Sequence, residues 1–423
     1  MISEKEYRNR RVKLAKSLKN NSITLLYSAT YQQRSNDTEY PFRQNSNFYY
    51  LSGFKEDKSI LIIIKKDKKI KTILFVEKKD VVAELWNGKR LGKKEAKKRF
   101  LVDKVYLNSD FDIVLAKHIV GCSKLYYDFT RDFPVSEILK TYTKNLYSVK
   151  NIAKYIATMR LIKSDAEIEV IKKAISITKD AHHKAMCFDK NEAYEYQLQA
   201  EMEYVFKKNG AYSDAYTSIV ASGDNANTLH YIKNNQKFKK DELILIDAGC
   251  EYDYYASDIT RTIPTSKRFT SAQKELYEMV LDVQEKIISM IKPDIKRSSL
   301  HKKSEKLLTL GMVKLGILDG DVKKLLKEKK YKKYYPHGIG HHLGLDVHDE
   351  VLYNDENFKE IPLKEGMVLT IEPGIYCPKD DESIPKKYRG IGIRIEDNIL
   401  VTKDGYENLS LEIVKKVKDI EKL

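Results

Sequence analysis

The residues best suited to chemistry lie in segment 335–349, which contains four of the nine histidines of the chain, namely His337, His341, His342 and His348. Three apolar segments, 243–247, 367–372 and 392–397, each end in or lead into carboxylates. Imidazole and carboxylate groups are ligands with which proteins hold divalent cations. We interpret these segments as parts of one metal site and the rest of the chain as its scaffold.

Asp247 and Asp258 are the first pair of candidate ligands. Segments 243–247 and 256–262 flank a loop that is too short for a parallel crossover, so we expect an antiparallel hairpin. With the turn at Tyr252 and Asp253, the two aspartates lie directly opposite each other, with Cβ atoms about 5 Å apart. Two carboxylates in that position repel, so a cation must compensate.

Glu372 and Glu396 are two further carboxylates that are expected to need a compensating positive charge. Glu372 ends an apolar run, where burial makes an unpaired carboxylate costly. Glu396 lies two residues after Arg394, so both side chains share one face of a strand. A salt bridge explains one such acid, but four acids and a histidine-rich turn favour divalent cations. His341, in a glycine-flanked turn, is the candidate nitrogen ligand.

The expected ligand set indicates both metal and chemistry. Four carboxylates and one imidazole form a hard, oxygen-rich ligand set. Such a set indicates Mn²⁺ or a similar ion rather than a thiolate-type zinc site. The four negative charges are enough to balance two divalent ions. Two such ions about 3.5 to 4 Å apart can share a bridging water and lower its pKa toward ~7. They can also polarise a carbonyl group beside that water. We therefore expect amide hydrolysis. His230 and His348 suit hydrogen bonding to the substrate or its oxyanion, although a structural role is open for His230 and favoured for His342.

The elements that position these residues should form two domains, 1–155 and 156–423, because 423 residues exceed the usual size of one core. In the first, β-branched segments 22–27, 59–64 and 71–76 alternate with a helix-compatible stretch at 93–100, which predicts an α/β domain. Segment 34–53 is polar and rich in turn residues. It predicts a loop that feeds a strand and that could carry binding residues.

The second domain contains two helix starts with strand patterns between them. Ser164 with Glu167, and Thr270 with Gln273, form capping boxes, and apolar residues follow each at helical spacing. Strand patterns occur at 218–223 and in the expected hairpin. An antiparallel sheet covered by helices, an α+β arrangement, is the expected fold.

Composition excludes several classes of protein. No apolar run approaches the roughly 18 to 20 residues of a membrane helix, and the charged N-terminus lacks a signal sequence, so we expect a cytoplasmic protein without membrane contact. Four scattered cysteines favour neither a zinc knuckle nor disulfides. The net charge of +16, densest at 323–333, comes without a base-reading motif, so no nucleic-acid partner is expected.

Taken together, these motifs resemble those of the Xaa-Pro aminopeptidases (aminopeptidase P), metallopeptidases of the pita-bread fold. The resemblance rests on segment 337–349, the spacing of Asp247 and Asp258, Glu372 in Ile-Glu-Pro-Gly-Ile-Tyr and Glu396 in Arg-Ile-Glu-Asp-Asn. Segments 43–54 and 85–92 extend it into the first domain. It implies an aminopeptidase P type N-terminal domain and a catalytic domain with a curved, mostly antiparallel sheet covered by helices.

The resemblance also implies an activity. With two metal ions, most often Mn²⁺, the protein would release the N-terminal residue from peptides that have proline in the second position. It would form a homo-oligomer, either a dimer or a tetramer. The implied metal ligands are Asp247, Asp258, His341, Glu372 and Glu396. The implied catalytic residues are His230, His348, Glu372 and Arg394, and the residues that would contact or border the substrate are Asp37, Trp86, Tyr216, His337 and Tyr376.

The resemblance further implies that Asp37 and Trp86 lie near the substrate's N-terminus, across a subunit contact. In the implied mechanism a metal-bridging hydroxide attacks the carbonyl before proline, Glu372 carries the proton to the proline nitrogen and His348 helps to hold the oxyanion.

Other functions stay open. Prolidase shares the fold and ligands but cleaves only Xaa-Pro dipeptides, and it tends to use an arginine where segment 351–371 offers only Lys359 and Lys364. A methionine aminopeptidase would leave the first domain unexplained. A non-catalytic pita-bread protein that binds other macromolecules typically lacks the ligands, all five of which are present here.

Overall fold

The computed structural model describes residues 1–129 and 148–423. The chain divides into two units, Met1–Arg160 and Leu161–Leu423, with the division a few residues after the boundary expected at 155. Within the described residues, no helix has the length and apolar character needed to cross a membrane.

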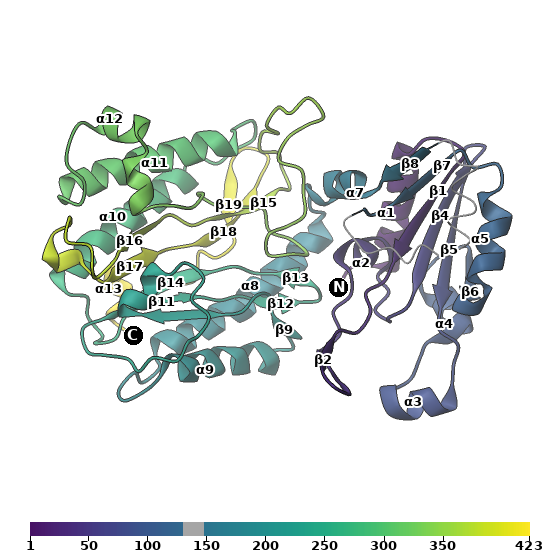
Figure 1. The fold of residues 1–423 in the computed structure, drawn as a ribbon, viewed down its shortest axis with the longest axis horizontal. Coiled ribbons are helices and arrows are strands. Elements are labelled where there is room, and N and C mark those ends of the chain that lie inside the picture. Colours follow the sequence, from purple (N-terminus) through teal and green to yellow (C-terminus); the bar gives the residue numbers. More distant parts are fainter. Residues whose placement is uncertain (130–147) are drawn as a thin grey trace. The chain divides into compact units, whose positions relative to one another are not determined.

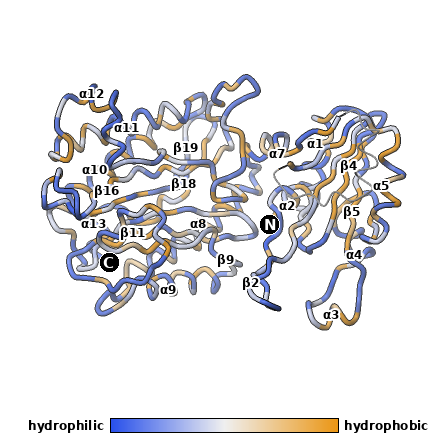
Figure 2. The backbone as a smooth tube through the Cα atoms, in the orientation of Figure 1, coloured by the Kyte–Doolittle hydropathy of each residue, from blue (hydrophilic) through white to orange (hydrophobic). Residues whose placement is uncertain are grey.

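A six-stranded mixed sheet in the order β6-β5-β4-β1-β7-β8 forms the centre of the first unit. Its strands are β1 (Ser22–Tyr27), β4 (Ile60–Lys66), β5 (Lys69–Val76), β6 (Lys104–Leu107), β7 (Lys124–Tyr127) and β8 (Ser148–Asn151). The strand patterns predicted from β-branched residues are confirmed. The middle of β4 is a continuous apolar run that is buried throughout, because helices cover both faces of the sheet. Figure 2 shows this apolar centre along β4 and β5.

Helices of the first unit pack on both faces of this sheet (Figure 1). Phe111 and Leu115 of α5 join Ile62 and Phe75 in one apolar cluster, whereas α1 contacts β4 and β5 from the opposite face. The helices are α1 (Glu4–Ser17), α2 (Ser46–Ser52), α3 (Val81–Asn87), α4 (Gly92–Arg99), α5 (Phe111–Ile119) and α7 (Ala153–Arg160), with a 3₁₀ turn η1 (Asn108–Asp110). The helix expected at 93–100 is confirmed as α4.

The prediction that segment 34–53 is a loop feeding a strand is wrong. Strands β2 (Gln33–Ser35) and β3 (Thr38–Glu39) form an exposed hairpin, and α2 follows. The Asn45 side chain accepts a hydrogen bond from the Phe48 N–H at 2.9 Å, and Gly53 ends the helix at φ +65°. Because all seven residues of α2 are buried, its sequence lacks the amphipathic pattern by which a helix is recognised.

The second unit consists of antiparallel strand pairs with helices around them, which confirms the expected α+β arrangement (Figure 1). The strands are β9 (Ser213–Asp214), β10 (Ile219–Ser222), β11 (Leu243–Asp247), β12 (Cys250–Tyr252), β13 (Tyr255–Ala256), β14 (Thr260–Pro264), β15 (Val368–Ile371), β16 (Gly374–Cys377), β17 (Ile391–Arg394), β18 (Asp397–Val401) and β19 (Tyr406–Asn408). They pair as β10-β11-β14, β13-β12-β9, β15-β18-β19 and β16-β17.

Both predicted capping boxes are confirmed. Ser164 and Glu167 exchange hydrogen bonds at the start of α8, and Thr270 and Gln273 do so at the start of α10. The helices of this unit are α8 (Asp165–Met186), α9 (Glu195–Lys208), α10 (Ser271–Ile288), α11 (Arg297–Lys314), α12 (Val322–Lys327) and α13 (Val417–Ile420), with 3₁₀ turns η2 (Gly223–Asn227), η3 (Lys330–Lys333) and η4 (Lys386–Tyr388). Their apolar faces and the strands share one core.

Candidate metal centre

Asp247 ends β11, and Asp258 lies two residues before β14. Asp247 pairs with Thr260, so the prediction that Asp247 and Asp258 lie directly opposite each other is wrong. The reason is the turn, which is formed by Asp253 and Tyr254, both at positive φ, one residue later than expected. This moves the pairing by two residues. Because side chains alternate with a period of two, both aspartates remain on the predicted face.

Tyr216 connects the two aspartates. Its hydroxyl lies 2.6 Å from Asp247 Oδ1 and 2.5 Å from Asp258 Oδ1. The approach of the two chain segments depends on Gly249, where a Cβ atom would lie 1.9 Å from the Ser257 carbonyl oxygen. The two carboxylates therefore face a common point.

Glu372 and Glu396 occupy breaks between strands. Glu372 lies between β15 and β16, and Glu396 between β17 and β18. The N–H of Glu372 donates to the Ile339 carbonyl at 2.9 Å, and that of Glu396 donates to the Thr260 carbonyl at 3.0 Å. At each break the backbone bonds to a neighbouring segment, and the carboxylate lines the same cavity as the aspartates.

His341 is fixed on β15 by two hydrogen bonds with Thr370. The His341 N–H donates to Thr370 Oγ1 at 3.1 Å, and the Thr370 N–H donates to the His341 carbonyl at 2.8 Å. Its ring Nδ1 lies 3.2 Å from the His342 carbonyl oxygen. Nε2 then points to the acids, 3.2 Å from Asp258 Oδ2 and 3.8 Å from Glu372 Oε1.

The acids of this cluster exceed the cations that the protein places beside them. Burial raises the pKa of Glu372 to about 7 and, together with the charge of Asp258, raises that of Glu396 well above its usual range. Burial also raises the pKa of Asp247, against the opposing effect of Arg394. Although burial opposes it, the pKa of His341 rises to about 9 beside Asp258.

These residues fit a metal site. Ligand atoms of Asp258, His341 and Glu396 lie within 4.8 Å of one another. Four buried acids with perturbed pKa values, facing one guanidinium and one imidazole, leave negative charge that divalent cations would balance.

Arg394 joins the acids to a second group of side chains. Its Nη2 donates to Asp247 Oδ2 at 2.6 Å, and its Nη1 donates to the Tyr376 hydroxyl at 2.9 Å. That hydroxyl lies 2.8 Å from His337 Nε2. Burial lowers the pKa of His337 to about 3, so the ring is neutral. Its Nδ1–H donates to the Gly338 carbonyl at 2.8 Å, and its Nε2 therefore accepts a hydrogen bond from the Tyr376 hydroxyl.

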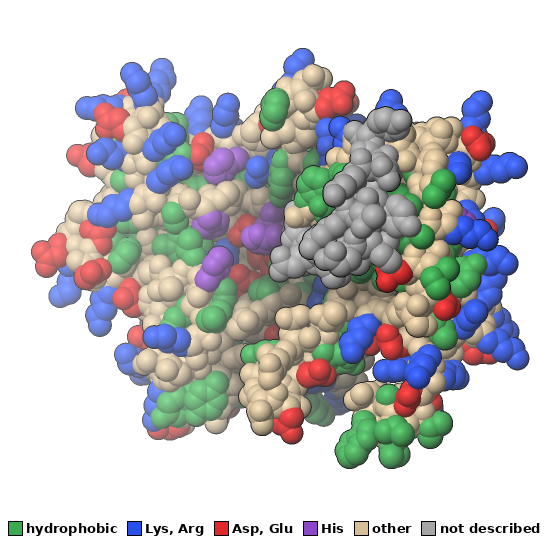
Figure 3. Space-filling view, turned by 45° about the vertical axis from the view of Figure 1, so that its right-hand side comes forward, with side chains coloured by type: hydrophobic (Ala, Val, Ile, Leu, Met, Phe, Trp, Pro, Cys, Tyr) green, Lys and Arg blue, Asp and Glu red, His purple; other side chains and the backbone are tan. Residues whose placement is uncertain are grey.

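These side chains surround a cavity of about 660 Å³. All five candidate ligands line it, together with Tyr216, His230, His337, His348 and Arg394, and with the apolar residues Ile219, Leu229, Ile232 and Val347. The ring of His348 lies 3.9 Å from that of His341, centre to centre. Figure 3 shows histidine side chains gathered on this face of the second unit, with acidic side chains among them. Tyr376 lies behind Arg394 and His337 and does not line the cavity.

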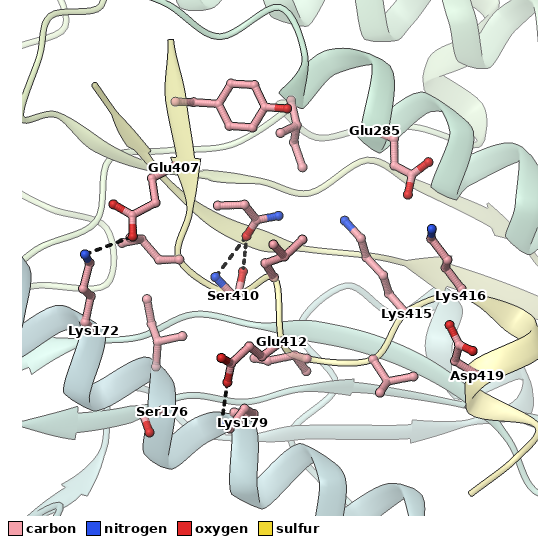
Figure 4. Close-up of a pocket in the computed structure, with 18 residues that line it drawn as sticks. Lys172, Ser176, Lys179, Glu285, Glu407, Ser410, Glu412, Lys415, Lys416 and Asp419 are labelled. Carbon is pink, nitrogen blue, oxygen red and sulfur yellow. Dashed lines mark hydrogen bonds and ion pairs between the residues drawn. The ribbon is translucent and has the colours of Figure 1, made fainter. Parts of the chain in front are cut away.

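Two of the predicted site residues belong to the first unit. Asp37 lies in the turn between β2 and β3, and Trp86 lies in α3 with 80% of its side chain exposed. A larger cavity of about 1200 Å³ in the second unit is lined by ion pairs such as Lys172 with Glu407, and none of the predicted site residues lines it (Figure 4).

Sequence reasoning missed the threonines that hold the acids in place. Thr260 Oγ1 donates to Glu396 Oε2 at 2.7 Å and accepts from Arg394 Nε at 3.2 Å. Thr262 Oγ1 donates to the Arg394 carbonyl at 3.0 Å. A signal was present, because Asp258, Thr260 and Thr262 alternate along the chain and so share a face.

Two family models match the chain. Metallopeptidase family M24 matches residues 169–403, which include the five candidate ligands. The aminopeptidase P N-terminal domain matches residues 7–126.

Relatives match over the whole chain. The Xaa-Pro aminopeptidases of Haemophilus influenzae and Escherichia coli are each 38% identical, over 100% of this chain and 97% and 98% of theirs. Human Xaa-Pro aminopeptidase 3 is 38% identical over 100% of this chain and 86% of its own.

Solved structures agree with the sequence matches. Aminopeptidase P from E. coli with the inhibitor Pro-Leu has a TM-score of 0.95 at 37% identity, covering 100% of this chain and 98% of that one. A zinc-substituted form of the E. coli enzyme with product has a TM-score of 0.94 over the same shares. With an aminopeptidase P N-terminal domain followed by a pita-bread catalytic domain whose acids and histidine converge, the chain belongs to the Xaa-Pro aminopeptidases of metallopeptidase family M24.

Proposed function

We propose that this protein uses two metal ions to remove the N-terminal residue from peptides that have proline in the second position. The convergence of Asp247, Asp258, His341, Glu372 and Glu396 on one cavity carries this proposal. These five residues would hold the metal, and the oxygen-rich set favours Mn²⁺. When bound, such ions supply Lewis acidity and an activated water.

Glu372 is the proposed proton carrier. It lines the cavity, and burial raises its pKa to about 7, so it can both accept and release a proton near neutral pH. It would take a proton from the attacking water and deliver it to the proline nitrogen. That nitrogen must be protonated to leave, because it departs as an amine.

His348 and His230 are the proposed contacts to the substrate carbonyl. Burial and the nearby His341 lower the pKa of His348, so its ring is neutral at pH 7 and can donate one N–H to a developing oxyanion. His230 lines the same cavity. Proline has no N–H and a fixed φ, and the apolar side chains of the cavity offer its ring contact without requiring that donor.

The cavity favours an aminopeptidase over a prolidase. Among the described residues that line it, Arg394 is the one lysine or arginine, and both of its terminal nitrogens already bond to Asp247 and Tyr376. A dipeptide's carboxylate would therefore lack a free cation. Longer peptides have no such requirement.

The deciding experiment compares a tripeptide Xaa-Pro-Xaa with a dipeptide Xaa-Pro, each with Mn²⁺ and after treatment with EDTA. We expect the tripeptide to be cleaved at its first bond and cleavage to be lost with EDTA. Cleavage of the dipeptide alone would make the protein a prolidase. Cleavage of neither would favour a non-catalytic binding role.

We also propose a cytoplasmic homo-oligomer in which Asp37 and Trp86 approach the N-terminus of a peptide bound to another copy. Helix α3 supports this, because none of its residues is buried and Val81, Leu85 and Trp86 are each at least 80% exposed. Leu85→Glu should lower the oligomeric state in sedimentation and weaken tripeptide binding, whereas a monomeric wild type would contradict the proposal. Cell fractionation tests the location.

A further inference from the structure

Lys163 and Asp349 form a buried ion pair next to the candidate metal centre. Lys163 Nζ lies 3.0 Å from Asp349 Oδ2, and each side chain is about 1% exposed. Lys163 directly precedes Ser164, the cap of α8, whereas Asp349 directly follows His348. The pair therefore joins the start of a long helix to the segment that carries the candidate histidines.

Asp349 closes this segment at its base. The Asp349 N–H donates to the His342 carbonyl at 2.9 Å, and Oδ1 accepts from the Asp346 N–H at 3.4 Å. At Gly344 a Cβ atom would lie 2.5 Å from Asp349 Oδ2. The carboxylate thus fills the inside of the 342–349 loop, where a side chain on residue 344 would displace it.

Lys163 binds the same part of the molecule through its backbone. Its N–H donates to the Gly366 carbonyl at 2.8 Å, just before β15, the strand that ends next to Glu372. One lysine therefore connects α8, the approach to β15 and the histidine loop.

The two histidines of this loop depend on Asp349 to different degrees. His341 is held separately by Thr370 and by the bridge between His342 and Leu369. His348 is adjacent to Asp349, so a shift of Asp349 moves His348 first. We propose that Lys163 and Asp349 are positioning residues that hold His348 against His341, and so place the oxyanion contact without helping to bind metal. This inference rests on the proposed peptidase function.

The test uses Lys163→Met, Asp349→Asn and the double variant, with Lys179→Met as the control. Lys179 lies on the same α8 helix and pairs with Glu412 at 2.7 Å near the surface (Figure 4). Each protein is assayed on Xaa-Pro-Xaa at saturating Mn²⁺ for kcat and KM. The Mn²⁺ dissociation constant and the Tm are measured in parallel.

Each single variant should lower the Tm, because it removes one member of a buried ion pair. We expect kcat to fall by about 10- to 100-fold while KM and the Mn²⁺ dissociation constant stay within about threefold. The double variant removes both charges and should regain most of the Tm, but kcat should stay low because the tether is absent. The control should match the wild type in all four quantities.

Recovery of kcat together with Tm in the double variant would overturn the inference, since the pair would then matter only for stability. A Mn²⁺ dissociation constant that rises as much as kcat falls would also overturn it. If the wild type cleaves no peptide, the proposed function fails. The positions of the His341 and His348 rings then test the positioning role instead. A crystal structure of the double variant that keeps the 3.9 Å spacing of the His341 and His348 rings would then contradict the positioning role.

Discussion

Glu396 and Asp397 are neighbours in the chain, and both are buried, but their charges are handled in opposite ways. Asp397 bonds to Arg261 at 2.8 Å and to Lys415 at 2.6 Å. Although burial opposes it, these cations lower its pKa to about 2. Glu396 instead faces Asp258 and Glu372, and burial together with their charges raises its pKa well above the usual range. The protein therefore pairs the structural acid with two cations, whereas Glu396 has Arg394 nearby but lies among acids whose charges, together with burial, outweigh it.

Glu372→Gln should produce the largest effect on activity, because the amide cannot carry a proton. We expect kcat on Xaa-Pro-Xaa to fall by about 10²- to 10⁴-fold at saturating Mn²⁺. Glu365→Gln, an exposed glutamate on the loop before β15, is the matched control and should retain full activity. Near-full activity of Glu372→Gln would remove the proposed role.

Asp397→Asn and Glu396→Gln compare the two neighbours directly in metal-free protein. Asp397→Asn leaves Arg261 and Lys415 without their carboxylate, and it should lower the free energy of unfolding by about 3 to 5 kcal/mol. Glu396→Gln should cost less than about 1 kcal/mol, because burial beside Asp258 and Glu372 already disfavours the charged form of that acid, which forms no ion pair like that of Asp397. Denaturant unfolding measures both changes, and equal losses would contradict the contrast.

The dependence of stability on low pH should distinguish Asp397 from Glu396 further. The pKa of Asp397 is lower in the folded protein than in the unfolded chain, so its contribution is complete above about pH 4 and is lost as the pH falls through about 2. The contribution lost is about 2 kcal/mol. We expect wild type to lose this much more stability than Asp397→Asn between pH 5 and pH 2, measured by unfolding; parallel curves would refute the assignment.

Metal binding should respond to pH around neutrality. A pKa of about 7 for Glu372 in the metal-free protein means that the proton competes with the metal below pH 7. We expect Mn²⁺ affinity to weaken by up to about tenfold for each pH unit below 7, with proton release on binding. Calorimetry in buffers of different ionisation enthalpy detects this release, and its absence at pH 6.5 would count against the raised pKa.

The acids of the site could be identified from the sequence because each carboxylate lies where a buried apolar segment would not be expected to carry a charge. A carboxylate at the end of an apolar run is costly to bury, so Asp247, Glu372 and Glu396 were identifiable without a structure. The hairpin register was not, because the turn uses Tyr254 at φ +73°, a conformation that tyrosine rarely adopts. Helix α2 was missed because a fully buried helix has no polar face.

The partners of the acids were harder to predict for another reason. Thr260 lies 136 residues before Glu396, and Lys163 lies 186 residues before Asp349. Such pairs depend on how distant segments pack, and a single sequence carries no periodicity that would indicate them. The α/β and α+β character of the two units, by contrast, follows from local patterns such as the capping boxes and β-branched strands.

The register of the hairpin between Asp247 and Asp258 restricts how its length can vary. The strand pairing continues from β11 through the tip at Asp253 and Tyr254 to β14. An insertion at the tip therefore changes the register of every residue pair along the hairpin. Adding two residues keeps Asp258 on the face of Asp247. Adding one either turns Asp258 to the other face or forces a bulge. Homologous chains should therefore differ at this tip by even numbers of residues.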